Sequence, residues 1–393
     1  MVLSSISLAS SFKVIYSFGN NSPKGGVPFG DQLVFDAKGN LYGTTSGGGN
    51  LKSCPPQGCG TVFKLSPFGN GWTEKVIHEF DWNVDGEGLY YNLVLDPDGN
   101  LYGVTGDGPV INNHLYAGAI FELSPSANGT WAETVLYKWP GGGQPESGLV
   151  RDEAGNLYGN HGLTFELSAA SKGQWTEREI GAPPTTFSDS ALTLKDGNLY
   201  DAGGAGKYIY GMVYEFTRAK DGSWQQRDLY DFAEKGADPT AGVVFDSKGN
   251  IYGATGGGGT YSNACWTYGG EFGCGTVFKL TPTAHGQWKE TVLHRFESAY
   301  DGFGPGNTLT IDNAGNLYGV AAGGINGYGV LFKLSPGTDG KWNYSVLHRF
   351  TDAKDDGAWP DTVMVFDKLQ THLNGTTEYG GAYNSGTVFE ITL

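Results

Sequence analysis

The five residues "GNLYG" at 39–43 recur unchanged at 99–103, 155–159 and 315–319. Three degenerate copies continue the series, with "GNLYD" at 197–201, "GNIYG" at 249–253 and "THLNG" at 371–375. Internal repetition on this scale indicates an architecture in which each copy marks one supersecondary unit. The chain of 393 residues therefore contains seven such units.

Around the first copy, the period-two alternation of apolar residues predicts four short strands. The segments "QLVFDAKGNLYGTT" and "GTVFKLSPFGNGWTEKVIHEF" divide into strand A (Leu33–Phe35), strand B (Asn40–Thr45), strand C (Thr61–Leu65) and strand D (Trp72–Phe80). Four antiparallel strands per unit are typical of a propeller blade. The same A to D order applies to the first six units.

The turn between strands A and B reads "DAKGN" in the first unit and returns as "DPDGN", "DEAGN", "DSKGN" and "DNAGN". We expect Asp36 to accept backbone N–H groups of the turn and Gly39 to take the left-handed conformation of a bulge. Calcium binding is the alternative, because "DPDGN" resembles part of an EF-hand loop, but the downstream glutamate of that loop is absent. Turn capping is the preferred interpretation, so no cofactor is predicted and structural calcium has no further support. Leu41 and Tyr42 would point to opposite faces of the blade and pack there.

The two ends of the chain decide how the ring closes. Six units end in a strand D led by a tryptophan, namely Trp72, Trp131, Trp175, Trp224, Trp288 and Trp342. The seventh unit stops at "GTVFEITL" after strand C, and its missing strand D is predicted at 12–18, where "FKVIYSF" matches "EKVIHEF". One strand from the start and three from the end would leave no sheet edge open at the junction. The sequence therefore predicts an all-β, seven-bladed β-propeller that forms a single domain over residues 1–393.

The predicted blades have approximate bounds of 31–80, 91–139, 147–180, 189–232, 241–296, 307–350 and, for the last, 361–393 plus 12–18.

Composition excludes several classes of function. The 65 glycines and 13% aromatic residues fit short strands and turns. The net charge of −16 argues against nucleic acid as a partner, because phosphates need a basic surface.

The sequence contains no run of about 18 apolar residues, so no membrane span is predicted. The weakly apolar start "MVLSSISLASSFKVIYSF" does not predict an intact signal peptide. Because a closed ring removes a common β-edge route to association, a monomer is expected.

The four cysteines form two local pairs, Cys54/Cys59 and Cys265/Cys274, in glycine-rich loops that lead into "CGTVFKL". Pairing within single loops predicts two disulfides and an oxidising compartment, so a secreted or extracytoplasmic protein is expected. A zinc site is the alternative, but four thiolates would have to come from loops far apart in the sequence. No metal site is predicted.

The units written "D-x-x-G-N-L-Y-G-T-T…G-G…G-T-V-F-K-L-S-P", as at 36–67 and 246–282, resemble the bacterial tandem repeat called GloVer. This repeat is found in secreted or surface-anchored proteins. The strand-turn-strand core is also similar to the propeller repeats of two-component-regulator sensors. The resemblance covers nearly the whole chain and implies a propeller in an extracytoplasmic setting, and it brings no catalytic residues.

Candidate binding residues lie outside the repeat, in the D–A and B–C loops that vary in length and content. We call the face that carries these loops the variable face. Its surplus aromatic residues, together with one histidine, are Trp82, Tyr90, His114, Trp266, Tyr300, Tyr328, Trp359 and Tyr379. Flat aromatic rings suit the apolar faces of sugars or a protein hot spot. The alternative is that they only cover loop backbone.

Candidate catalytic residues come from the blades that depart from the consensus. They are His161 in blade 3, Asp201, Lys207, Tyr208 and Tyr210 in blade 4, and Glu378 near the C-terminus. His, Tyr and Lys can support β-elimination of a uronic-acid polysaccharide, whereas Asp201 with Glu378 or Asp361 can supply the acid pair of a glycoside hydrolase. Neutral drift of a degenerate blade explains the same residues. Three further histidines, His78, His294 and His348, share one strand D position and are interpreted as packing residues.

The leading hypothesis from these observations is a secreted, carbohydrate-binding propeller, with a glycoside hydrolase or polysaccharide lyase as its catalytic form. The alternative is a non-catalytic extracellular scaffold for protein interaction. A polysaccharide or oligosaccharide is the expected partner in the first case.

Overall fold

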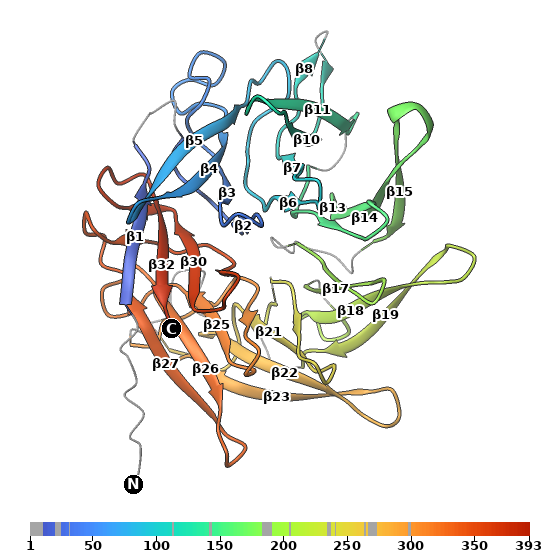
Figure 1. The fold of residues 1–393 in the computed structure, drawn as a ribbon. Helices are drawn as coiled ribbons and strands as arrows, with labels where there is room; N and C mark the ends of the chain where they lie inside the picture. Colours follow the sequence, from blue (N-terminus) through green and yellow to red (C-terminus); the bar gives the residue numbers. More distant parts are fainter. Residues whose placement is uncertain are drawn as a thin grey trace.

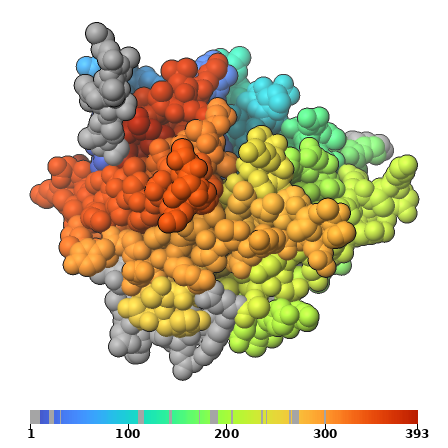
Figure 2. Space-filling model, turned by 90° about the horizontal axis from the view of Figure 1, so that it is seen from below, coloured from blue at the N-terminus to red at the C-terminus, as the bar shows by residue number. Residues whose placement is uncertain are grey.

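The computed structural model shows seven four-stranded antiparallel sheets that follow one another around a ring (Figure 1). The structure describes residues 11–393 apart from 20–24, 31, 112–113, 141–143, 183–190, 204–205, 234–236, 240, 263–264, 266–272 and 298–299. In Figure 2 the ring is seen from its edge, with consecutive blades running from red through orange to yellow-green. The prediction of an all-β, seven-bladed propeller is confirmed.

Each blade begins with a very short inner strand and ends with a long outer one. Blade 1 holds β2 (Val34–Phe35), β3 (Leu41–Thr45), β4 (Thr61–Phe68) and β5 (Gly71–Glu79); blade 2 holds β6 (Val94–Leu95), β7 (Leu101–Thr105), β10 (Ala119–Pro125) and β11 (Trp131–Lys138). Blade 3 holds β12 (Val150–Arg151), β13 (Leu157–Asn160), β14 (Thr164–Ala169) and β15 (Trp175–Gly181); blade 4 holds β16 (Thr193–Lys195), β17 (Asn198–Gly203), β18 (Met212–Arg218) and β19 (Trp224–Asp231).

The remaining blades repeat this order. Blade 5 holds β20 (Val244–Phe245), β21 (Ile251–Thr255), β22 (Thr276–Pro282) and β23 (Trp288–Arg295); blade 6 holds β24 (Thr310–Ile311), β25 (Leu317–Ala321), β26 (Val330–Pro336) and β27 (Trp342–Arg349). Blade 7 holds β29 (Val365–Phe366), β30 (His372–Thr377), β32 (Thr387–Thr392) and β1 (Ser11–Ser17). Two small pairs, β8 (Val110–Ile111) with β9 (His114–Leu115) and β28 (Gly357–Ala358) with β31 (Tyr379–Gly380), lie in loops, and the turn η1 (Ser171–Gly173) precedes β15.

The ring closes as the sequence predicts. Strand β1 pairs antiparallel with β32 from Ser11↔Thr392 to Ser17↔Thr387, and the sheet order is β1-β32-β30-β29. The N-terminal strand thereby becomes strand D of blade 7 (Figure 1). Phe12 then stacks on His348 of blade 6, with 3.7 Å between ring centroids.

The "DAKGN" turn owes its shape to one carboxylate. Oδ1 of Asp36 accepts the backbone N–H groups of Lys38 and Asn40, both at 2.9 Å, which confirms turn capping. Gly39 has a φ of 81°, a left-handed conformation that favours glycine. Oδ2 of Asp36 accepts the side-chain amide of Asn40 and the hydroxyl of Tyr42 at 3.1 Å. The tyrosine of the repeat therefore bonds the turn as well as packing in the core, a role that was not predicted from the sequence.

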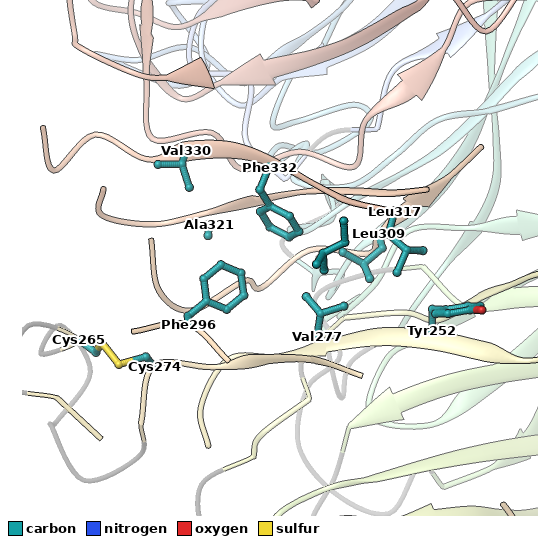
Figure 3. Packing of buried hydrophobic residues seen from close by; sticks show 11 residues of the cluster. Tyr252, Cys265, Cys274, Val277, Phe296, Leu309, Leu317, Ala321, Val330 and Phe332 are labelled. Atoms are coloured by element: carbon teal, nitrogen blue, oxygen red, sulfur yellow. A yellow bond between two sulfur atoms is a disulfide. The ribbon is translucent and has the colours of Figure 1, made fainter. Parts of the chain in front are cut away.

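The hydrophobic core lies in the seams between blades. At the seam of blades 5 and 6, Tyr252 and Val277 pack against Leu317 and Phe332, as Figure 3 shows. The Cys265–Cys274 disulfide lies at the opposite end of this cluster from Tyr252. Each blade is thus covered on both faces by its neighbours. Because successive side chains of a strand point to opposite faces, consecutive residues of the repeat, such as Leu41 and Tyr42, can both be buried.

The strand D histidines pack in the seams as interpreted, and they also bind the loops. The imidazole of His294 stacks on Tyr344 of the next blade at 4.0 Å between centroids, and Nε2 of the same ring lies 3.1 Å from Asp301. Nε2 of His348 lies 2.9 Å from Asp356 in the same way. Each histidine therefore fixes the D–A loop that follows its own strand, a role that the repeat pattern did not reveal.

Candidate functional site at the channel mouth

The inner strands of all seven blades surround a central cavity of about 410 Å³. Side-chain hydrogen bonds join neighbouring blades along its wall. Nδ2 of Asn92 donates to the carbonyl of Leu149 at 3.1 Å, and Oγ1 of Thr310 donates to the carbonyl of Met364 at 2.6 Å. These bonds satisfy polar groups that the ring would otherwise bury, so the inner wall is fixed from blade to blade.

The loops of the variable face are tied to one another. The D–A loop that enters a blade forms a short antiparallel bridge with the B–C loop of that blade, as in Gly26↔Gly47, Glu87↔Asp107, Phe303↔Ala322 and the β28–β31 pair. The backbone hydrogen bonds of these bridges therefore fix the positions of the loops that carry the side chains of this face. A rigid loop at the end of a closed sheet is a usual place for a binding site.

Trp359 is held on this face by two backbone hydrogen bonds. It follows β28, its N–H donates to the carbonyl of Tyr328 at 2.8 Å, and its carbonyl accepts the N–H of Glu378 at 3.1 Å. Its φ of 55° is left-handed, which is costly for a bulky side chain, yet 46% of the residue is exposed. Strained backbone that holds an exposed ring is a feature concentrated at functional sites.

Two carboxyl groups lie beside this tryptophan. Oδ1 of Asp361 accepts the side-chain amide of Asn307 at 2.8 Å, and the carboxylate also accepts the backbone N–H of Gly30. Burial raises the pKa of Asp361 above its usual value. Burial and the nearby charge of Asp361 both raise the pKa of Glu378, against a hydrogen bond from Tyr379 that lowers it. The pair therefore holds a proton more readily than exposed carboxylates do.

Exposed aromatic residues are carried by the same loops as these acids and by the loop that holds Gly30. Tyr379 is 40% exposed and pairs with Ala358 next to Trp359. Gly30, whose N–H donates to Asp361, lies against the carbonyl of Tyr90, and the rings of Phe29 and Tyr90 meet edge to face at 5.9 Å. We define the mouth platform as Phe29, Tyr90, Trp359 and Tyr379 with the acids Asp361 and Glu378.

Comparison with known families agrees with this architecture. The sequence matches the family model of the Gloeobacter/Verrucomicrobia repeat over residues 2–161 and 264–393, well over half of the chain. The protein belongs to the Gloeobacter/Verrucomicrobia repeat family. No curated protein matches the sequence. The mouth platform lies within the two matched segments of the Gloeobacter/Verrucomicrobia repeat.

The stretch without a match to the repeat, between these segments, contains the divergent blade 4. Its A–B connection is a tight hairpin in which Asp196 and Gly197 have φ values of 52° and 78°. Two consecutive left-handed residues are typical of a two-residue hairpin turn. The hydroxyl of Tyr200 consequently faces Asn198, at 3.5 Å, instead of a turn aspartate.

Asp201 and His161 lie in seams and do not reach the mouth platform. Asp201 is completely buried; its Oδ2 accepts the hydroxyl of Tyr214 at 3.0 Å and faces the amide of Asn160 at 3.5 Å. Nε2 of His161 lies 3.5 Å from Glu177. These contacts give both residues structural partners, so we leave them out of the proposed site.

The other candidates of blade 4 lie in the loop after β17. The backbone N–H of Lys207 donates to Asp231 at 2.6 Å, and its ammonium lies 5.0 Å from the ring centroid of exposed Tyr208. Tyr210 packs against the blade 4 and 5 core. In the described part of the chain, no hydrogen bond or ion pair links His161 to Lys207 or Tyr208. A lyase role for these residues therefore stays a prediction, and the described contacts do not bring them together.

The remaining aromatic candidates are dispersed. Trp82 packs near Cys54, Tyr328 is half-buried beneath Trp359, and Tyr300 is 69% exposed on the loop before blade 6. His114 belongs to β9, and Trp266 lies outside the described residues. Phe29 was not among the predicted residues, because its exposed ring does not belong to any repeated motif.

Both predicted disulfides are present, Cys54–Cys59 and Cys265–Cys274, each with 5.2 Å between Cα atoms. Disulfides of this kind fit an oxidising compartment. None of the described residues forms a helix that is both long and apolar enough to cross a bilayer.

Proposed function

We propose that the protein binds a saccharide chain across the mouth platform. The observation that carries the proposal is the exposed indole of Trp359, held in left-handed backbone by two main-chain hydrogen bonds and placed beside Asp361 and Glu378. Aromatic faces pack against the apolar faces of sugar rings, and carboxylates accept hydrogen bonds from sugar hydroxyls. A few polar groups within an aromatic surface are the usual composition of such a site.

Charge narrows the class of saccharide. The chain carries a net charge of −16, and the platform itself contributes two carboxyl groups and no basic residue. A polyanionic chain would be repelled from this surface. We therefore propose a neutral polysaccharide or oligosaccharide as the ligand, which disfavours lyase chemistry on uronic acids.

Glycoside hydrolysis is a second candidate, supported by the acid pair. A glycosidase needs one carboxyl group that stays protonated as the general acid and a second one as its partner. The raised pKa of Glu378 and its position next to exposed Tyr379 suit the proton donor. Asp361 is assigned as the partner because the hydrogen bonds from Asn307 and Gly30 favour its ionised form, against the effect of burial. The ligand chain would reach these groups from the solvent side of Trp359.

The cellular setting belongs to the same proposal. The two disulfides support a secreted or extracytoplasmic protein, which is where a polysaccharide ligand is met. Closure of blade 7 by β1 supports a monomer.

A panel of neutral polysaccharides tests the binding step, with affinity measured by gel retardation and titration calorimetry. Trp359→Ala is expected to weaken binding at least tenfold. Phe68→Ala is the matched control, because Phe68 is a 73% exposed aromatic residue at a C–D turn on the opposite face and should leave affinity unchanged. If no glycan of the panel binds, the proposal fails and the protein-interaction scaffold becomes the better hypothesis.

Release of reducing ends tests the hydrolytic step on any glycan that binds. Glu378→Gln should abolish release while affinity stays within a few-fold of the unsubstituted protein. Binding without release would limit the function to recognition.

A further inference from the structure

The seam between blades 1 and 2 brings a histidine and two carboxylates together. His78 lies on β5, Asp85 in the D–A loop that follows it, and Glu133 on β11 of blade 2. Nε2 of His78 is 2.8 Å from Oδ2 of Asp85. One nitrogen or oxygen atom from each of the three side chains lies within 4.8 Å of the other two. This spacing is close to that between neighbouring ligands of one metal ion.

Glu133 lacks the partner that such a buried oxygen needs. Its Oε1 is buried and accepts no hydrogen bond in the described part of the chain. Burial and the charge of Asp85 raise the pKa of Glu133 to about 7, while His78 and Lys138 act in the opposite direction. An unpaired carboxylate beside another one is costly, and a cation held between them removes that cost.

The other seams show why this set is unusual. Where the strand D residue is a tyrosine, its hydroxyl donates to the glutamate of the next blade, as in Tyr16–Glu74, Tyr137–Glu177 and Tyr230–Glu290. Those glutamates therefore meet a hydroxyl donor from strand D in place of an imidazole. Glu177 also lies 3.5 Å from Nε2 of His161, which follows β13. A neutral phenol is a poor metal ligand compared with imidazole.

Where the strand D residue is another histidine, the next blade contributes an aromatic ring in place of the glutamate. His294 keeps its aspartate but is stacked on Tyr344, and His348 is stacked on Phe12. Among the described seams, the combination of histidine, loop aspartate and facing glutamate occurs between blades 1 and 2.

We propose that His78, Asp85 and Glu133 bind a divalent transition-metal ion of the zinc class. One imidazole nitrogen and two carboxylate oxygens are a usual ligand set for zinc, with water completing the coordination, whereas calcium prefers oxygen ligands alone. The ion would separate His78 and Asp85 by a few tenths of an ångström from their present contact and draw Glu133 inward. It would clamp the outer strands of two blades to the D–A loop between them.

Zinc titration of the EDTA-treated full-length protein tests the proposal at pH 7.5, by calorimetry and by the visible absorption of Co²⁺ as a substitute. We expect one equivalent to bind and, at about 100 times Kd, to raise the unfolding temperature by about 3 °C. Binding should weaken as pH falls, because the ligands must lose their protons.

Two substitutions copy pairings that the chain already uses. His78→Tyr recreates the Tyr16–Glu74 arrangement, and Glu133→Tyr recreates the His294–Tyr344 arrangement, so both variants should fold. Glu133→Tyr should keep the metal-free unfolding temperature, whereas His78→Tyr should lower it slightly because the bond to Asp85 is lost. Each should weaken zinc binding at least tenfold, and Glu290→Gln, at the equivalent position of blade 5, should leave it unchanged. The absence of saturable binding, or equal affinity in His78→Tyr, would overturn the proposal.

Discussion

The hydroxyl of Tyr42 donates a hydrogen bond to Oδ2 of Asp36 at 3.1 Å, so the second residue of β3 is bonded to the first residue of the turn that precedes the strand. The same bond joins Tyr102 to Asp96, Tyr158 to Asp152, Tyr252 to Asp246 and Tyr318 to Asp312. Burial, with the charges of Glu122 and Asp96, raises the pKa of Tyr102 to about 12. The phenol therefore stays a donor at neutral pH, and turn and strand form one unit.

Removing one of these hydroxyls should lower stability measurably. Tyr318→Phe keeps the ring, which is 1% exposed, and loses a hydrogen bond to a charged group. We expect a loss of about 1.5–3 kcal/mol in the free energy of unfolding, measured by urea denaturation. Tyr208→Phe in blade 4 is the control, because its ring is 43% exposed and its hydroxyl bonds no turn aspartate, so the substitution should cost less. Equal costs at the two sites would contradict this role for the bond.

The turn aspartates predict how stability depends on pH. Hydrogen bonds from Asn250 and Tyr252 lower the pKa of Asp246 against an opposing effect of burial, and Asp36 and Asp96 are lowered in the same way. A carboxylate whose folded pKa lies below its unfolded value adds stability that is present above the unfolded pKa, near 4, and disappears as pH falls through the folded pKa. The urea midpoint should therefore drop steeply below pH 4. The difference between the unsubstituted protein and Asp246→Asn should shrink over the same range; a constant difference would be inconsistent with the shift.

Much of the fold could be predicted because its signals are local. Turn residues such as Asp36 and Gly39 determine the conformation of a segment only five residues long. The alternation of residues around Leu41 likewise indicates a strand from its immediate neighbours alone. Ring closure was predictable as well, because β1 carries the same pattern as the other outer strands. The two disulfides were visible for the same reason: each pair lies within one loop.

The candidate site was predictable only in part, because its contacts join different blades. Trp359, Tyr379, Asp361 and Glu378 could be chosen as variable-face residues, but nothing in their spacing says that they meet beside Gly30 of blade 1. Asp201 was attractive because it replaces a glycine, yet that position points into a seam, where burial is complete. A repeat pattern gives the faces of a blade but not which loops of neighbouring blades touch.

The seam between blades 7 and 1 offers a test with two adjacent threonines. Thr376 is completely buried, and in the described part of the chain its hydroxyl has no hydrogen-bond partner. The hydroxyl of Thr377 donates to the carbonyl of Tyr379 at 2.8 Å and lies 2.8 Å from that of Thr387. Thr376→Val should raise the free energy of unfolding by about 1 kcal/mol, whereas Thr377→Val should lower it by about 1–3 kcal/mol. Urea denaturation that shifts in the same direction for both variants would refute this assignment.

Strand β1 should be required for a cooperative fold. Removing residues 1–18 takes away the whole ladder with β32 and the stacking of Phe12 on His348. The exposed edge of β32 then becomes free to pair with other chains. We expect a broadened thermal transition and concentration-dependent aggregation, seen by calorimetry and light scattering. A synthetic peptide of residues 11–19 should restore the sharp transition when added, and a scrambled peptide should not; full cooperativity without either peptide would contradict the closure argument.

Trp359 allows binding and stability to be separated. Its φ of 55° is strained for tryptophan and relaxed for glycine, so Trp359→Gly removes the indole and relieves the backbone together. The relief, about 1–2 kcal/mol, opposes the packing lost with a side chain that is already half exposed, and the net change in the free energy of unfolding should be within about 1 kcal/mol. Glycan affinity should nevertheless fall at least tenfold, as in Trp359→Ala, because the aromatic face is gone. Trp359→Ala should be less stable than Trp359→Gly, since alanine keeps the left-handed strain.

A purely structural role for Trp359 would give the opposite result. Both substitutions would then destabilise the propeller strongly, and glycan affinity would fall only in proportion to the fraction of folded protein.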